Sequence, residues 1–169
     1  ADQDVLERKY GLETARALWQ IAEDAKAEIK RLIADHRIDA AWRDGVAFLN
    51  WTTAGAAETR DYARHLQEVF RADHVEALDE AQARALVGSE AYRGGMIDWT
   101  AGHIHPLRFA LGLARAIRVP IYEETEATAI TKHSRGWRVE TPGGTVSAQR
   151  VILATNGYHG GLAREVSKR

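Results

Sequence analysis

The sequence predicts a mixed α/β (α+β) fold, with helices in its earlier part and an antiparallel meander near its end. Apolar residues recur at helical spacing from about 12 to 34, which is typical of a long amphipathic helix. Alternating segments at 121–130, 137–140 and 145–147 are separated by glycine-containing turns, which predicts three antiparallel strands. The run Val151 to Ala154 has no polar alternation, as expected of a strand buried on both faces.

The remaining elements follow from local signals in chain order. Asp44-Gly45 is a turn signal before a short strand, and Asp79 with Gln82 forms a capping box before a helix that ends at Gly88. Pro106 suits the first turn of a helix, because its missing N–H has no intrahelical partner there. The predicted elements are a strand at 46–51, helices at 56–70 and 80–87, a strand at 94–100, and a helix from 106 that stops before Pro120.

The composition excludes several classes of protein. The chain has 169 residues, 45% of them hydrophobic, which is enough for one ordinary core. Its 23 basic and 24 acidic residues nearly balance, so no nucleic acid or anionic membrane is expected as a partner. The absence of cysteine excludes disulfides and thiolate chemistry. With no apolar run near membrane-spanning length and no signal-like start, a cytoplasmic protein is expected.

The residues after the apolar run form a turn suited to a ligand. Ala154, Thr155, Asn156 and Gly157 are small or turn-forming, so their backbone N–H groups are not obstructed by bulky side chains. The sequence therefore predicts close approach of a ligand to this backbone.

Four blocks of sequence, the last of which contains that turn, resemble a known family. They are residues 94–98, 102–107, 121–125 and 151–158, and their order and spacing resemble FAD-dependent oxidoreductases of the D-amino-acid oxidase superfamily. They are most similar to the gamma-glutamylputrescine oxidase branch, and the resemblance extends over nearly the whole chain from Gly11 onward.

The resemblance implies a fold, a cofactor and a reaction. Residues 1–100 would form part of a helix-and-sheet substrate domain, and residues 101–169 part of an FAD/NAD(P)-binding domain containing the meander. The cofactor neighbours would be Ala127, at a position where the family commonly has a valine near the adenine, and the turn Ala154 to Gly157. The intact enzyme would oxidise a small amine or amino acid to an imine, passing hydride to the flavin and using oxygen as acceptor.

One departure from the family pattern is important. None of the fourteen glycines falls in the Gly-x-Gly-x-x-Gly turn that sets the cofactor pyrophosphate on a helix N-terminus. We therefore expect an internal piece of a flavoenzyme, or a truncated relative, that does not retain FAD in isolation. The alternative is a non-catalytic globular or interaction module derived from the same fold, and exposed sheet edges in either would permit self-association.

Few side chains suggest a substrate pocket. His103 and His105 lie two apart on an extended segment, so their side chains point the same way and both are candidates to line a pocket. The structural alternative is that His105 caps the following helix and His103 packs locally. No third ligand lies nearby in sequence, so no metal site is expected. The other five histidines read as ordinary surface or turn residues.

Two tryptophans and two carboxylates complete the candidates. Trp51 and Trp99 have aromatic faces suited to a flavin or an amine, although such residues more often belong to a core. Asp98 and Glu90 are possible partners of an amine, although isolated carboxylates are usually solvated. No catalytic acid or base is identified from the sequence.

Overall fold

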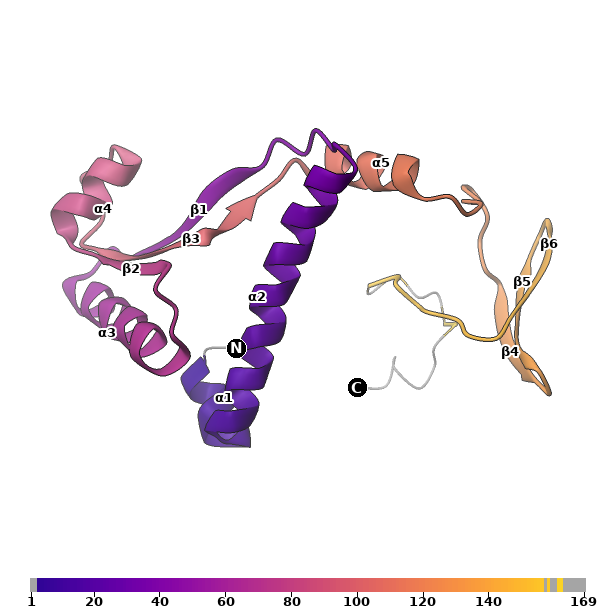
Figure 1. Cartoon of the computed structure of the whole chain (residues 1–169), viewed down its shortest axis with the longest axis horizontal. Helices are drawn as coiled ribbons and strands as arrows, with labels where there is room; N and C mark the ends of the chain where they lie inside the picture. Colours follow the sequence, from indigo (N-terminus) through magenta and orange to yellow (C-terminus); the bar gives the residue numbers. More distant parts are fainter. Residues whose placement is uncertain (1–2, 157, 159–160, 163–169) are drawn as a thin grey trace. The chain divides into compact units, whose positions relative to one another are not determined.

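The computed structural model describes residues 3–156, 158 and 161–162, and it confirms the mixed α/β class (Figure 1). The chain divides into two compact units, the first ending at Arg118 and the second beginning at Val119. The boundary expected at residue 100 lies inside the first unit, and the assignment of the two parts to substrate and cofactor domains stays a prediction.

The described part of the chain contains five helices and two three-stranded sheets. The helices are α1 (Gln3–Tyr10), α2 (Leu12–Asp35), α3 (Thr53–Phe70), α4 (Glu80–Val87) and α5 (Pro106–Ala116). The strands of the first unit are β1 (Arg43–Leu49), β2 (Val75–Leu78) and β3 (Gly95–His103), and those of the second are β4 (Ala129–His133), β5 (Gly136–Thr141) and β6 (Gly144–Ala148).

The first sheet has the strand order β1-β3-β2, and both pairs are antiparallel. The register pairs Val46 and Val75 with Asp98, and Phe48 with Met96, so these side chains share one face of the sheet. Asp44-Gly45 is not a turn before the strand, as predicted, but a bulge inside β1, where the pairing shifts between Asp44 and Val46. The positive φ of Gly45, 92°, accommodates the extra residue.

Helices cover both faces of the first sheet. On the face of Met96, the buried core consists of residues from α2, α3 and the sheet, with Leu6 of α1 and Trp19 of α2 packed against it. On the other face, Ala83 of α4 packs with Leu78 and Ile97. β1 and β2 are the edges of this sheet, and self-association through such edges stays a prediction.

The predicted helix ends are confirmed where the sequence carried a cap. Asp79 accepts a hydrogen bond from the Gln82 backbone N–H, and the Gln82 side chain accepts one from the Asp79 backbone N–H. Gly88 ends α4 in the left-handed region. Helix α1 and strand β2 were not predicted. Both are short, and their apolar residues are buried only through contacts with other elements of the first unit.

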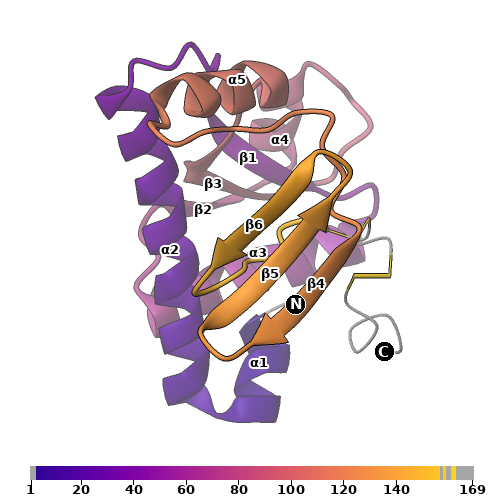
Figure 2. The same cartoon turned by 90° about the vertical axis from the view of Figure 1, so that its right-hand side faces the viewer.

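The second unit forms the predicted meander, with β5 between β4 and β6 (Figure 2). Its first strand is shorter than predicted. The segment 121–128 has no strand, so Ala127 lies before β4, although the alternation there suggested otherwise. The alternation becomes a strand only from Ala129, where β5 supplies the pairing through Glu140.

The predicted buried strand from Val151 to Ala154 is wrong for this structure. These residues have no strand assignment, and Ile152 and Leu153 are 88% and 43% exposed. An apolar run becomes a buried strand only where a neighbouring strand pairs with its backbone. Among the described residues, none of the six strands pairs with this segment.

None of the helices in the described segments combines the length and the apolar character needed to cross a membrane.

Candidate functional site

The predicted cofactor segment is exposed. Ala154, Thr155 and Asn156 are exposed, Ala127 is half-buried, and Gly157 lies outside the described residues. Asn156 has a φ of 53°, in the left-handed region, so a turn begins there as the sequence suggested. Whether these residues contact a cofactor stays a prediction.

The predicted pocket residues lie apart from one another. His103 pairs with Arg43 at one end of β1, whereas Trp51 follows the other end of that strand. At about 3.3 Å per residue, the two ends of β1 are roughly 20 Å apart, too far for one small ligand. Trp51 is 67% exposed and its ring lies 4.7 Å from that of Tyr92.

His105 has a local structural role. Its side chain caps α5 by accepting a hydrogen bond from the backbone N–H of Arg108, at 3.4 Å, as the structural alternative predicted. His103 is exposed at the end of β3. Whether either histidine contacts a substrate stays a prediction.

A half-buried group of charges joins α2 to the first sheet. The Lys26 ammonium donates to Asp98 of β3 and forms an ion pair with Glu23 of its own helix, both at 2.8 Å. Asp98 also accepts hydrogen bonds from the Thr100 hydroxyl and from the backbone N–H groups of Thr100 and Ala101. Asp98 is therefore not a solvated carboxylate, and its amine partner in this structure is a lysine.

These neighbours favour the charged form of both partners. Burial acts to raise the pKa of Asp98, but the hydrogen bonds from Lys26, Ala101 and Thr100 outweigh it and hold that pKa below its usual value. Burial likewise acts to lower the pKa of Lys26, but its bonds to Asp98 and Glu23 raise it above the usual value. The pair is thus ionised at neutral pH.

His74 completes this group, although the sequence suggested an ordinary surface residue. Its Nε2 is buried without a hydrogen-bond partner, 3.4 Å from a Glu23 oxygen and 3.8 Å from an Asp98 oxygen, and its ring stacks on Trp19. Ligand atoms of Glu23, His74 and Asp98 lie within 4.8 Å of one another, a spacing that a metal ion would accept. The Lys26 ammonium lies 2.8 Å from both carboxylates, so in this structure a lysine side chain, and not a metal ion, balances their charge.

A cavity of about 600 Å³ lies beside this group, between α1, α2 and α3 and the sheet face of Met96. Its volume falls in the range of small-molecule sites. Three carboxylates and three aromatic rings line it, and none of its lining residues is basic. The lining residues are Asp4, Trp19, Phe48, Glu58, Thr59, Tyr62, Leu66, Val75, Met96 and Asp98.

The carboxylates of the cavity differ in how they are neutralised. Asp4 pairs with Arg8 at 2.7 Å and Asp98 with Lys26, whereas no ion pair of Glu58 occurs among the described residues. Sequence reasoning found only Asp98 of these three. Asp4 and Glu58 belong to no motif, and the packing of α1 on α2 and α3 brings them to the same cavity.

Comparison with known proteins places the chain in a family. The model of the DAO family, FAD dependent oxidoreductase, matches residues 4–169. Gamma-glutamylputrescine oxidoreductase of Escherichia coli (strain K12) is 35% identical over 99% of this chain and 40% of its own length. The probable oxidoreductase OrdL of Rhizobium meliloti (strain 1021) is 32% identical over 94% of this chain and 38% of its own length.

Solved structures agree with this assignment. Glycine oxidase from Geobacillus kaustophilus superposes with a TM-score of 0.69 and 25% identity, over 90% of this chain and 40% of its own. L-proline dehydrogenase from P. horikoshii, at 17% identity, a TM-score of 0.67 and coverage of 86% and 40%, shares the fold. The chain spans about two fifths of the length of these relatives. It belongs, as the resemblance predicted, to the DAO family of FAD-dependent oxidoreductases.

Proposed function

We propose that the protein takes part in the oxidation of an amine, or of the amine of an amino acid, to an imine. The carbon beside nitrogen loses a hydride and the nitrogen loses a proton, while oxygen gains two electrons and two protons to give peroxide. FAD, when bound, would accept the hydride. Water then hydrolyses the imine.

The observation that carries this proposal is the acidic, aromatic lining of the 600 Å³ cavity. A protonated amine is attracted by carboxylates and by the faces of aromatic rings. Glu58 offers a carboxylate without an ion pair in the described part, and Trp19 and Tyr62 offer rings in the same wall. We assign binding and orientation of the amine to these residues, and no proton transfer.

Two relatives support the class of substrate by their names. One is an oxidoreductase of gamma-glutamylputrescine, an amine, and the other an oxidase of glycine, an amino acid. Both names are compatible with a cationic nitrogen in the cavity, and neither identifies the amine for this chain.

We assign contacts with the adenine and ribose portion of FAD to a few residues of the second unit. They are Ala154, Thr155 and Asn156, which are exposed, and Ala127, which is half-buried. Most of the cofactor's charge is on its pyrophosphate, and no glycine turn of the required pattern occurs in the sequence. These residues therefore do not form a complete FAD site by themselves.

That missing pattern also favours a second function, a non-catalytic module with the family fold. The visible spectrum of the protein as expressed from its gene separates the two. A flavin band that bleaches on anaerobic addition of an amine, with peroxide formed on admission of oxygen, supports the oxidase. A colourless protein that gives no peroxide with any amine would support the module.

A further inference from the structure

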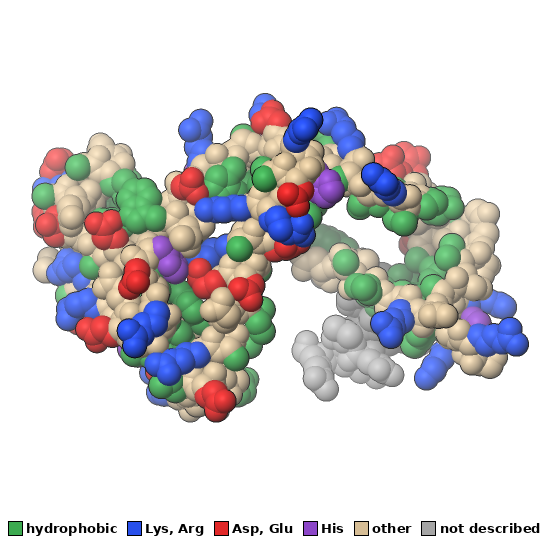
Figure 3. Space-filling view, in the orientation of Figure 1, with side chains coloured by type: hydrophobic (Ala, Val, Ile, Leu, Met, Phe, Trp, Pro, Cys, Tyr) green, Lys and Arg blue, Asp and Glu red, His purple; other side chains and the backbone are tan. Residues whose placement is uncertain are grey.

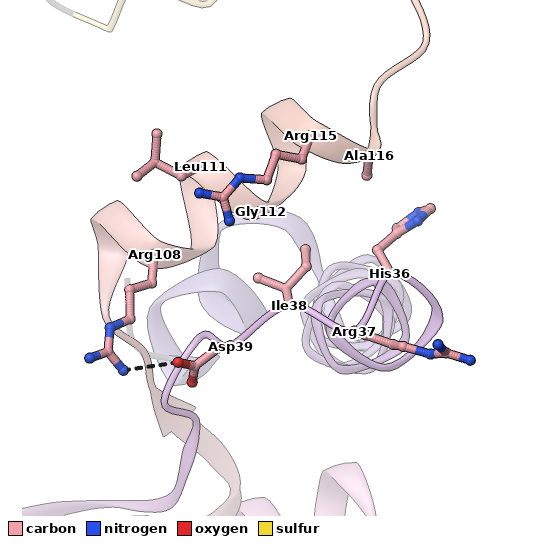
Figure 4. Close-up of a pocket in the computed structure, with 9 residues that line it drawn as sticks. All are labelled: His36, Arg37, Ile38, Asp39, Arg108, Leu111, Gly112, Arg115 and Ala116. Carbon is pink, nitrogen blue, oxygen red and sulfur yellow. Dashed lines mark hydrogen bonds and ion pairs between the residues drawn. The ribbon is translucent and has the colours of Figure 1, made fainter.

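A second cavity, of about 430 Å³, lies in the first unit between the loop that follows α2 and one side of α5 (Figure 4). The loop contributes His36, Arg37, Ile38 and Asp39, and the helix contributes Arg108, Leu111, Gly112, Arg115 and Ala116. None of these residues lines the acidic cavity.

The packing of one residue pair explains why this cavity forms. Ile38 is 8% exposed and lies so close to α5 that a Cβ atom on Gly112 would be 2.2 Å from its Cγ2. Arg108 and Arg115 stand four residues before and three after Gly112, so all three lie on one face of the helix. The cavity therefore has an apolar floor at Ile38 with arginines on either side of it.

The charge of this lining is positive and incompletely neutralised. Three arginines and one carboxylate are among the lining residues, and of these arginines Arg108 has an ion pair in the described part of the chain, with its Nη1 3.2 Å from an Asp39 oxygen. Arg115 and Arg37 have no ion pair among the described residues. In Figure 4 the Arg115 side chain runs back along α5 toward Gly112, whereas Arg37 points away from the other labelled residues. Figure 3 shows both basic and acidic side chains over the region where α2 ends and α5 lies.

We propose that this cavity binds a small organic anion through a phosphate group. A guanidinium presents parallel N–H donors that match phosphate oxygens, and two of them on one helix face give an anion more than one contact. The apolar floor at Ile38 and Leu111 suits an organic body attached to that phosphate. The site depends on its own charges and geometry, so its existence does not depend on the proposed amine oxidation.

Phenyl phosphate and inorganic phosphate are the probes for this site. Each is titrated into the 169-residue chain at constant ionic strength, with chloride as the replaced anion, and followed by calorimetry and by backbone amide shifts. We expect saturable one-to-one binding, tighter for phenyl phosphate, with the largest shifts at residues 36–39 and 108–116.

Three single variants test whether the charges of this cavity set the affinity for phenyl phosphate. Arg115→Gln should weaken binding about fivefold or more, because it removes one charge-assisted contact. Asp39→Asn should tighten it roughly two- to threefold, because it frees Arg108 and removes a repelling charge. Arg43→Gln, at an exposed arginine of β1 outside the cavity, is the matched control and should leave the affinity unchanged.

Two results would overturn the proposal. One is a linear, unsaturated response to both probes in the wild-type chain. The other is equal weakening by Arg43→Gln and Arg115→Gln, which would mean that the anion responds to overall charge rather than to this cavity. Circular dichroism of each variant tests whether the fold is retained. Flavin content and peroxide formation are measured separately, so failure here leaves the proposed oxidation untouched.

Discussion

Asp98 is a carboxylate whose charge ties β3 to α2 through Lys26. Both side chains are half-buried, 16% and 23% exposed, so removal of the Asp98 charge leaves Lys26 with Glu23 as its one remaining carboxylate partner among the described residues and weakens the hydrogen bonds that Thr100 and Ala101 donate. We expect Asp98→Asn to lower the free energy of unfolding at pH 7 by about 1 to 3 kcal/mol, measured by urea denaturation. Asp44→Asn removes the exposed partner of Lys30 and should cost much less.

The pH dependence of that difference follows from the pKa directions. The pKa of Asp98 is lower in the folded state, so its stabilisation is present above the unfolded value, about 3.9, and is lost as pH falls through the folded value. The pKa of Lys26 is raised above 10.5, so its stabilisation is lost only as pH rises through that higher value. The gap between wild type and Asp98→Asn should narrow below about pH 4. A gap that stays constant down to pH 2 would contradict this account.

Glu58 allows the proposed binding of an amine in the 600 Å³ cavity to be tested at a single position. If the proposed amine oxidation is right, Glu58→Gln in the intact enzyme should raise the KM for a cationic amine severalfold without changing flavin content, because it removes an attracting charge from the cavity wall. Glu68→Gln is the matched control, since Glu68 is exposed on the same helix and does not line the cavity. Equal KM values for the two variants would show that Glu58 does not contribute to binding of the amine.

The contact between α5 and the loop after α2 depends on the absence of a side chain at Gly112. Alanine normally stabilises a helix interior by up to about 1 kcal/mol relative to glycine. Here its Cβ would overlap the buried Ile38, so we expect Gly112→Ala to destabilise by about 1 to 2 kcal/mol net in thermal or urea unfolding.

Two further variants test whether the overlap causes the loss of stability. In Gly143→Ala the new Cβ meets no atom within 4 Å, so this variant should be nearly neutral. The double variant Ile38→Ala, Gly112→Ala should be less destabilised than the sum of its two single changes, because the overlap is relieved. Strict additivity would show that the two residues do not interact.

The whole chain is expected to retain FAD poorly. Its sequence lacks the glycine turn for the pyrophosphate, so contacts at Ala127 and Ala154 to Asn156 must offset the entropy lost on association, roughly 4 to 15 kcal/mol. We expect a dissociation constant weaker than about 1 mM in isothermal titration of the 169-residue chain with FAD. Micromolar binding would mean that this chain carries a complete cofactor site.

Much of the fold could be predicted because its signals are local. The long helix α2 follows from apolar spacing, α4 from its capping box and Gly88, and α5 from Pro106, and each signal lies within a few residues of the structure it specifies. The family was recognised for a related reason, since its short blocks keep their order and spacing along the chain. Local patterning was insufficient at Val151 to Ala154, because a strand requires a partner that an apolar run does not supply.

The two cavities and the charged group depend on contacts between distant parts of the chain. Lys26 and Asp98 are 72 positions apart, and Asp39 and Arg108 are 69 positions apart. Isolated charges of this kind have no spacing or periodicity that distinguishes them from solvated surface residues. Lys26 and Asp98 become partners because α2 packs against β3, and Asp39 and Arg108 become partners because Ile38 packs against Gly112. The tertiary packing therefore creates the proximity that a binding site needs.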